Sequence, residues 1–239
     1  MRTLLSRLGL KKPWQRCLLV AVLSFPLALG VRQALQAVVP VNLAADAVEY
    51  VRRYKERPLS EPLTHLLNDT AHPRVPTQPH ALLGQEPIDF TLLDDQGAPV
   101  CLEELRRDGP VVLVFYYGYR CSHCVSQLFA LNEDLALFRE LGAQVVAVSA
   151  DAPELTAERF REYGRFDFPV LSDPGNQVAR SYGVYRPASD DSPEELLHAT
   201  FLIGTDGCVF WVNCGLTPFL DNKTLLQEIA QHEGVLPPG

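Results

Sequence analysis

The feature that most constrains the fold is an apolar run that leads directly into a pair of cysteines. Residues 111–117 read Val-Val-Leu-Val-Phe-Tyr-Tyr, which is typical of a buried strand, and the C-x-x-C pair Cys121 and Cys124 stands where a helical pattern begins. A strand that leads into a helix places both cysteines in the first helical turn, where unpaired backbone N–H groups and the helix dipole favour thiolates. Because the cysteines are three residues apart, their sulfurs share one helix face, close enough to form a disulfide.

The neighbouring residues favour thiol redox chemistry at this pair. Arg120 and His123 add positive charge beside the turn, so we expect at least one acidic, reactive thiol and an influence of His123 on the redox potential. His123 is alternatively a solvated surface residue. A zinc site and two inert core thiols are the alternatives for the pair itself, but structural zinc takes four ligands and the sequence has no second C-x-x-C and no H-x-x-x-H. We therefore expect no metal.

Composition indicates a folded domain with an acidic surface. The chain has 239 residues, of which 47% are hydrophobic and 21% charged, enough to bury one large core. The net charge is −8, yet residues 1–16 carry five basic residues and no acid, so the remainder is more acidic still. An acidic body argues against a nucleic-acid partner.

The amino-terminal 40 residues resemble a membrane anchor or an export signal. An uncharged segment, residues 17–31, follows the basic start and ends at Arg32. Its 15 residues are short against the roughly 20 that span a bilayer, but the apolar pattern resumes beyond Arg32. We expect a retained single-pass anchor with the basic end in the cytoplasm and the redox domain extracytoplasmic, in the periplasm or its equivalent. An exported soluble protein after signal cleavage and a mitochondrial presequence are the alternatives.

Residues 41–80 are expected to connect this anchor to the redox domain. Residues 41–58 have the periodicity of an amphipathic juxtamembrane helix, and residues 58–80 contain five prolines, which predicts a stiff linker with one short helix near residues 63–67. His65, His72 and His80 match no metal geometry there, so we expect solvated loop residues. The catalytic domain is then residues 81–239.

That domain alternates strands and helices in a way that predicts an α/β fold. Strands are expected at 88–93, 99–101, 111–117, 144–150, 168–171, 198–204 and 208–214, and helices at 121–141, 153–163 and 221–232. Continuous Val and Ile runs separated by helices indicate parallel neighbours covered on both faces.

Three further cysteines lie within this pattern. Cys101 starts a run with capping-box spacing, which makes it a candidate helix cap. Cys208 and Cys214 fall on one predicted strand, where six steps separate their α-carbons by roughly 20 Å, too far for a disulfide. We expect Cys208 and Cys214 to be ordinary buried thiols, and the alternative is that Cys208 pairs with Cys101 across the domain.

Several segments resemble the peroxiredoxin-like branch of the alkyl hydroperoxide reductase/thiol-specific antioxidant (AhpC/TSA) family. They are residues 112–128, 141–151, 168–174, 178–183 and 199–207, and the resemblance covers about residues 81–235. It implies a thioredoxin-like fold with a central mixed sheet and helices on both faces. It also implies an antioxidant enzyme that reduces hydroperoxides through a redox-active disulfide, without a cofactor.

The sequence departs from that family at important positions. The peroxiredoxin P-x-x-x-T-x-x-C loop places Tyr117 at the proline, Cys121 at the threonine and Cys124 at the nucleophile. The family's peroxide-polarising arginine falls at His198, beside Thr200. Thioredoxins proper have a cis-proline where this chain has Ala199.

The resemblance and the residues together predict a two-cysteine cycle. Cys124 attacks the peroxide to give a sulfenic acid, and Cys121 resolves it to a disulfide that an unknown thiol donor reduces. In the alternative, thiol–disulfide exchange on protein disulfides, Cys121 attacks and Cys124 resolves. A third alternative is copper handling of the Sco type, in which His198 joins the cysteine pair, although Sco proteins have three residues between their cysteines and this chain has two.

Overall fold

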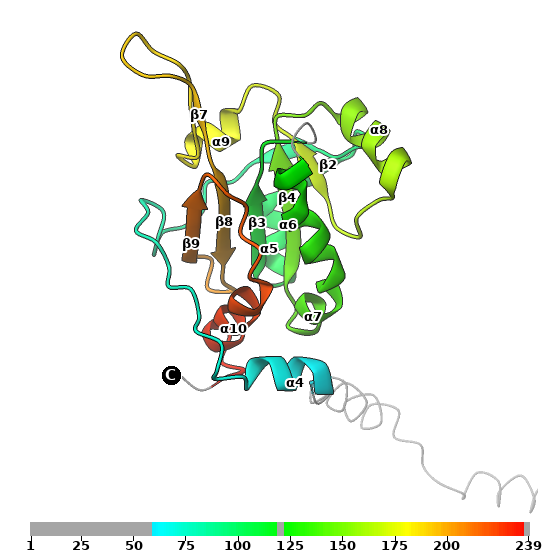
Figure 1. Ribbon diagram of the computed structural model, residues 1–239, viewed down its shortest axis with the longest axis vertical. Coiled ribbons are helices and arrows are strands. Elements are labelled where there is room, and N and C mark those ends of the chain that lie inside the picture. Colours follow the sequence, from blue (N-terminus) through cyan, green and yellow to red (C-terminus); the bar gives the residue numbers. More distant parts are fainter. Residues whose placement is uncertain (1–58, 119–121, 237–239) are drawn as a thin grey trace, which may run out of the picture. The chain divides into compact units, whose positions relative to one another are not determined.

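A mixed sheet of seven strands organises the part of the chain that the computed structural model describes, residues 59–118 and 122–236 (Figure 1). Its order is β2-β1-β5-β4-β3-β8-β9. The strands are β1 Thr91–Leu93, β2 Pro99–Cys101, β3 Val111–Phe115, β4 Gln144–Ser149, β5 Val170–Ser172, β8 His198–Ile203 and β9 Val209–Gly215. The continuous apolar runs β3, β4 and β5 are parallel, as predicted, whereas β8 and β9 are antiparallel to their neighbours.

Helices cover both faces of this sheet. One face carries α4 Glu61–Leu67, α6 Ser122–Glu133, α7 Leu135–Glu140 and α10 Asn222–His232, and the other carries α5 Leu102–Asp108 and α9 Gln177–Ser181. A further helix, α8 Pro153–Tyr163, follows β4 and contacts β5. Side chains of β3 alternate between two apolar cores: Val112 and Val114 join the first face, and Leu113 and Phe115 the second. The expected α/β architecture is confirmed.

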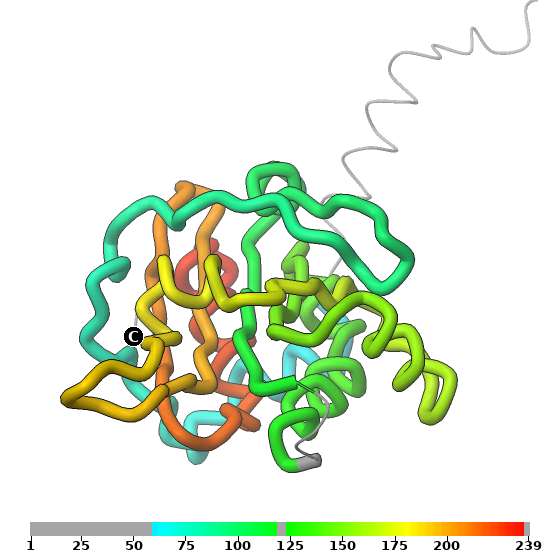
Figure 2. The backbone as a smooth tube through the Cα atoms, turned by 90° about the horizontal axis from the view of Figure 1, so that it is seen from above, coloured from blue at the N-terminus to red at the C-terminus, as the bar shows by residue number. Residues whose placement is uncertain are grey.

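Three elements differ from the prediction. The single helix expected over residues 121–141 divides at Asp134, whose carbonyl accepts the N–H of Leu137 at 2.9 Å. Helix α9 and the hairpin formed by β6 Tyr185–Arg186 and β7 Glu195–Leu196 were not predicted, because such short elements produce no periodic signal. Figure 2 shows the chain between β6 and β7 projecting beyond the sheet.

The stiff linker expected over residues 58–80 is, over its described part from Leu59 onward, packed against the domain. Ser60 caps α4 by accepting the N–H of Leu63, and Leu63 and Leu67 are buried in the same core as α10. Farther along, the carbonyl of Val75 accepts the indole N–H of Trp211 at 3.1 Å. The compact unit therefore begins at Leu59 rather than near Ala81, because prolines prevent a regular helix or strand here but leave carbonyls and apolar side chains free to bind.

The predicted anchor and juxtamembrane helix, together with Cys17, lie outside the described residues. None of the helices in the part of the chain that the structure describes combines the length and apolarity needed to cross a bilayer.

Cys101, Cys208 and Cys214 carry free thiols. The alternative of a Cys101–Cys208 disulfide was therefore wrong, and the prediction that Cys208 and Cys214 do not pair with each other is confirmed. Cys101 occupies the N-cap position of α5, but its side chain makes no capping hydrogen bond. Burial raises the pKa of the Cys214 thiol to about 11, so Cys214 is not a thiolate at neutral pH.

Candidate redox site

The candidate site begins where β3 ends and the chain turns toward α6. The N–H of Tyr116 still donates to the carbonyl of Val148 at 3.1 Å, so the loop stays attached to β4. Gly118 follows with φ +90°, and a β-carbon there would lie 2.4 Å from an oxygen of Asp151. Both the positive φ and this close approach require glycine, which lets the chain pass directly over the carboxylate that follows β4.

Cys124 lies in the first turn of α6, as the sequence predicted. Its side chain is only 1% exposed, and it is disulfide-bonded. Cys101, Cys208 and Cys214 are free thiols, so its disulfide partner lies outside the described residues. A disulfide sulfur is not the thiolate that a structural zinc site requires. Cys124 is therefore a buried, disulfide-bonded cysteine at the start of a helix.

Arg120 and Cys121 lie outside the described residues. Their predicted roles, as a charge that activates the thiols and as the second redox cysteine, stay predictions. Among the described residues, no cluster of three or more His, Cys, Asp or Glu side chains could hold a metal ion. The alternative copper site would include Cys121 and likewise stays a prediction.

Two histidines of the predicted site, His123 and His198, interact electrostatically. His123 is exposed in the first turn of α6, whereas His198, the first residue of β8, is 2% exposed. Burial, and then the charge of His123, lower the pKa of His198 to about 4. His198 is therefore uncharged at neutral pH and does not replace the family's positively charged arginine electrostatically.

Tyr117 covers His198 from the loop after β3. The two ring centroids are 4.4 Å apart, and the Tyr117 hydroxyl donates to the carbonyl of Leu196. Burial, and then the nearby carboxylate of Glu195, raise the pKa of Tyr117, so its hydroxyl stays protonated and keeps donating. The loop after β3 is thereby fixed to β7, and His198 is shielded from solvent.

A buried polar pair joins α6 to β8 one turn below the cysteine. Gln127 Nε2 donates to Thr200 Oγ1 at 2.8 Å, and both side chains are almost fully buried. Gln127 follows Cys124 by three residues and so shares its helix face, and Thr200 follows His198 by two and so shares its strand face. The predicted site residues Cys124, on α6, and His198 and Thr200, on β8, therefore lie on the two faces that this hydrogen bond joins.

Sequence reasoning missed the roles of Tyr117 and Gln127. The signal for Gln127 was present, because a glutamine at this spacing interrupts the apolar stripe of a helix that is otherwise built for burial. No comparable signal distinguished Tyr117 from the other aromatic residues of the same segment. Its contact with His198 depends on the pairing of β3 with β8.

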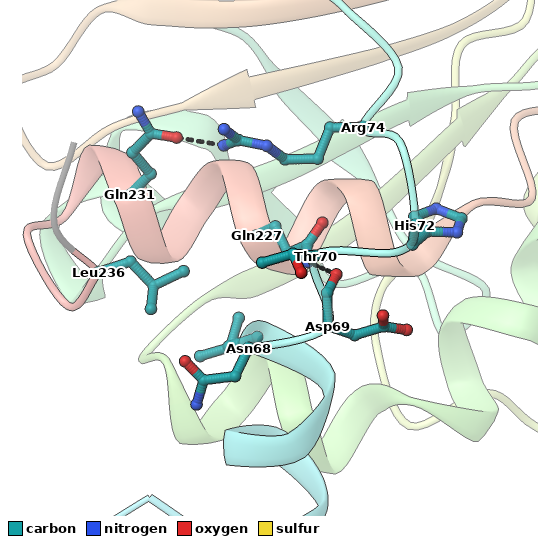
Figure 3. A pocket seen from close by; sticks show the side chains of 9 residues that line it. Asn68, Asp69, Thr70, His72, Arg74, Gln227, Gln231 and Leu236 are labelled. Carbon is teal, nitrogen blue, oxygen red and sulfur yellow. Dashed lines mark hydrogen bonds between the residues drawn. The ribbon is translucent and has the colours of Figure 1, made fainter. Parts of the chain in front are cut away.

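Two of the hollows on the described surface lie near the loop after β3 and near α10. One, of about 520 Å³, opens beside Tyr117 and is lined mainly by the β6–β7 hairpin, including Arg186, Glu194 and Glu195, and by Leu216 after β9. The other, of about 370 Å³, lies between the end of α4 and α10 (Figure 3). Its polar lining residues pair with neighbours, as Arg74 does with Gln231. Of these two, the first adjoins the candidate site through Tyr117.

Comparisons with known proteins agree with this geometry. Residues 83–212 match the model of the AhpC/TSA family. The chain is 30% identical over 135 residues to the thiol-disulfide oxidoreductase ResA of Halalkalibacterium halodurans, covering 56% of this chain and 70% of that protein. It is 36% identical over 123 residues to a putative peroxiredoxin of Mycobacterium tuberculosis, covering 52% of this chain and 79% of that protein.

Solved structures show the same relationship. The crystal structure of peroxidoxin BcpB from Mycobacterium tuberculosis is similar with a TM-score of 0.55 and 32% identity, covering 62% of this chain and 97% of that chain. Peroxiredoxin Q of Xanthomonas campestris has a TM-score of 0.53 at 20% identity, covering 60% of this chain and 90% of that one. The second likeness concerns the fold alone.

Proposed function

Because this chain belongs to the AhpC/TSA family and is a thiol-dependent oxidoreductase, we propose that Cys121 and Cys124 are its redox pair and hydroperoxides its substrates. The observation that carries the proposal is the disulfide-bonded Cys124 in the first turn of α6. Cys121 precedes Cys124 by three residues in the sequence, a spacing that suits a reversible disulfide at a helix start.

The reaction balances with two cysteines and one donor. The Cys124 thiol attacks the distal oxygen of a hydroperoxide, the O–O bond breaks, and the products are a Cys124 sulfenic acid and an alcohol. The Cys121 thiol then attacks that sulfur, forming the disulfide and releasing water. An external thiol donor, whose identity is open, returns two electrons and two protons to the pair.

The burial of Cys124 favours a second candidate, thiol–disulfide exchange. In this reaction the more accessible cysteine attacks the partner, and the buried one resolves the mixed disulfide. A sulfur that is 1% exposed suits the resolving role, which leaves the first attack to Cys121. The ResA relative is named for this reaction.

Oxidation of single-cysteine variants distinguishes the two functions. Reduced full-length Cys121→Ser and Cys124→Ser variants are exposed to hydroperoxide, and sulfenic acids are trapped and located by mass spectrometry. Rapid oxidation of Cys124 in Cys121→Ser supports hydroperoxide reduction. Thiols that resist peroxide but exchange with disulfides favour the second candidate. Cys208→Ser, which removes a free thiol outside the site, is the matched control.

We also propose that residues 1–40 anchor the protein in a membrane, with the redox domain extracytoplasmic. The basic start and the apolar segment of the sequence support this topology. Protease added to intact cells with a permeable outer envelope should digest the redox domain but spare the amino terminus. A full-length protein that is released into the soluble fraction would contradict the anchor.

A further inference from the structure

Between α6 and β8 the core contains polar atoms that have no partner. Gln127, Thr200 and His198 are at most 2% exposed. The amide of Gln127 reaches Thr200, but Gln127 Oε1 and both ring nitrogens of His198 have no hydrogen-bond partner among the described residues. An unpartnered buried polar group costs about 1–3 kcal/mol, so an imidazole with two such atoms is an expensive choice for a purely structural position.

The strand register places that imidazole at the edge of the sheet from which α6 starts. β8 pairs with β3 so that Ala199 lies opposite Phe115, the last residue of β3. His198 therefore lies at the end of the sheet where the chain turns into α6. From there α6 and β8 run in the same direction, so Gln127 meets Thr200 one step below, and Cys124 and His198 occupy the step above. The electrostatic effect of His123 on His198 agrees with this placement.

The reaction assigned to Cys124 requires a proton to move within this layer. In either candidate function a buried thiol loses its proton as its sulfur attacks, and the departing oxygen or sulfur gains one. Burial opposes a free thiolate and a free imidazolium alike, because both are charged. A neutral group that accepts a proton at one atom while it releases one from another avoids both charges.

Resting on the proposed thiol oxidoreductase function, we propose that His198 carries the proton from the Cys124 sulfur to the leaving group of the substrate. One ring nitrogen accepts the thiol proton while the other donates its own, so the imidazole ends neutral in the opposite tautomer. With a hydroperoxide, Cys124–SH and ROOH give Cys124–SOH and ROH. With a mixed disulfide on Cys121, Cys124–SH and Cys121–S–S–R give the Cys121–Cys124 disulfide and RSH.

The surroundings of His198 suit this role. Its low pKa, about 4, keeps it neutral at pH 7 and makes any imidazolium release its proton quickly. The titratable groups around it are His123 from α6 and Tyr117 from the loop after β3, with Glu195 of β7 acting on Tyr117. Thr200 and Gln127 act as positioning residues, since their hydrogen bond holds α6 against β8 at the next step.

The leaving group provides the test. Single-turnover oxidation of the reduced full-length chain is followed at pH 7 with tert-butyl hydroperoxide, whose alkoxide must be protonated as it leaves, and with peracetic acid, whose carboxylate leaves as the anion. The relay predicts that His198→Gln slows both reactions, because the thiol proton must be removed in each, but slows the hydroperoxide reaction on the order of 100-fold and the peracid reaction at least tenfold less than that. It also predicts that the variant loses the solvent deuterium isotope effect of the wild type on the hydroperoxide reaction.

Three outcomes are distinguishable. If His198→Gln slows both oxidation reactions equally, or slows neither, the relay is overturned while the proposed function stands. A wild type that reacts with neither oxidant but exchanges with disulfides overturns hydroperoxide reduction. The relay is then tested with glutathione disulfide against an aromatic disulfide with an acidic leaving thiol, and equal slowing overturns it there too. A wild type inert to all four oxidants overturns both proposals.

A second variant protects the test against misfolding. In His198→Ala the removed ring leaves room for added imidazole, which should restore the hydroperoxide rate at least tenfold if the ring acts as a proton carrier. A structural role would not be restored by a soluble base at unchanged thermal stability. His65→Gln, an exposed histidine of α4, is the matched control and should leave every rate unchanged.

Discussion

The two faces of β8 are built from alternate residues of one strand and serve different purposes. On one face Ala199, Phe201 and Ile203 join an apolar core in which Phe201 packs edge-to-face on Phe115 and Tyr182. On the other face His198 and Thr200 bring polar groups against α6. The first face stabilises the fold without burying polar side chains, whereas the second buries polar atoms at the proposed redox site.

Each face of β8 has one histidine nearby, and the two histidines differ in their hydrogen bonding. His80 packs on Phe201 with ring centroids 5.1 Å apart, and its Nδ1 accepts the N–H of Leu82 at 3.1 Å. We expected a solvated loop residue there, but His80 is half-buried. Burial lowers the pKa of both His80 and His198, yet of these two only His198 leaves both nitrogens unpartnered. The hydrogen-bonded His80 therefore has a structural role, whereas the ring nitrogens of His198 have no structural hydrogen bond among the described residues and stay available for the proposed proton transfer.

The apolar face should show the largest effect on stability. Phe201→Ala removes a fully buried ring between two aromatic neighbours and should lower the free energy of unfolding by about 3–5 kcal/mol. Urea denaturation measures this loss. Phe129→Ala, which removes a 42% exposed ring, should cost clearly less. Equal losses for the two variants would contradict the assigned packing.

Helix α4 contributes apolar side chains to the core on the face of the sheet that carries α6. Leu63 is fully buried there, so Leu63→Ala should lower the free energy of unfolding by about 2–5 kcal/mol. Leu66→Ala, on the same helix but only partly buried, is the control and should cost less. An unchanged unfolding midpoint for Leu63→Ala would mean that residues 59–67 do not belong to the cooperative unit.

The polar face should make stability depend on pH. The pKa of His198 is 6.5 ordinarily and about 4 in the folded protein, so between those values the unfolded chain binds more protons. His198 makes its full contribution to the free energy of unfolding above pH 6.5, and that free energy falls by about 2–3 kcal/mol as the pH drops to 4.

Urea denaturation across this range should show a weaker pH dependence in His198→Gln than in the wild type. His80 contributes in the same direction in both proteins and so cancels from the comparison. His65→Gln should keep the wild-type dependence. An identical slope in His198→Gln would show that the ring is not buried in its neutral form.

The smallest effect is expected at the hydrogen bond between the two elements of the polar face. Thr200→Val preserves the shape but leaves the Gln127 amide unpartnered, which should cost about 1–2 kcal/mol. Adding Gln127→Leu removes that amide as well and should recover part of the loss. A double variant that is less stable than Thr200→Val would show that Gln127 and Thr200 stabilise the fold by more than pairing each other's buried polar groups.

Much of this organisation could be predicted from sequence, since it follows from local patterns. Apolar runs placed β3, β4 and β8, helical periodicity placed α8 and α10, and the break after β3 placed Cys124 at a helix start. The packing of residues 59–80 could not be predicted, because prolines there suggest a linker while Leu63 and Trp211 form their contacts across the chain. The β6–β7 hairpin is too short to have a pattern.

The sequence by itself determined the α/β order, the family, and a cysteine pair at the start of a helix, because each depends on residues that are near one another along the chain. The tertiary structure alone decided that His198 is buried and uncharged, that Tyr117 covers it, and that Gln127 reaches Thr200. Those contacts join residues more than 70 positions apart. They exist only because β8 pairs antiparallel with β3 and thereby brings its polar face beneath α6.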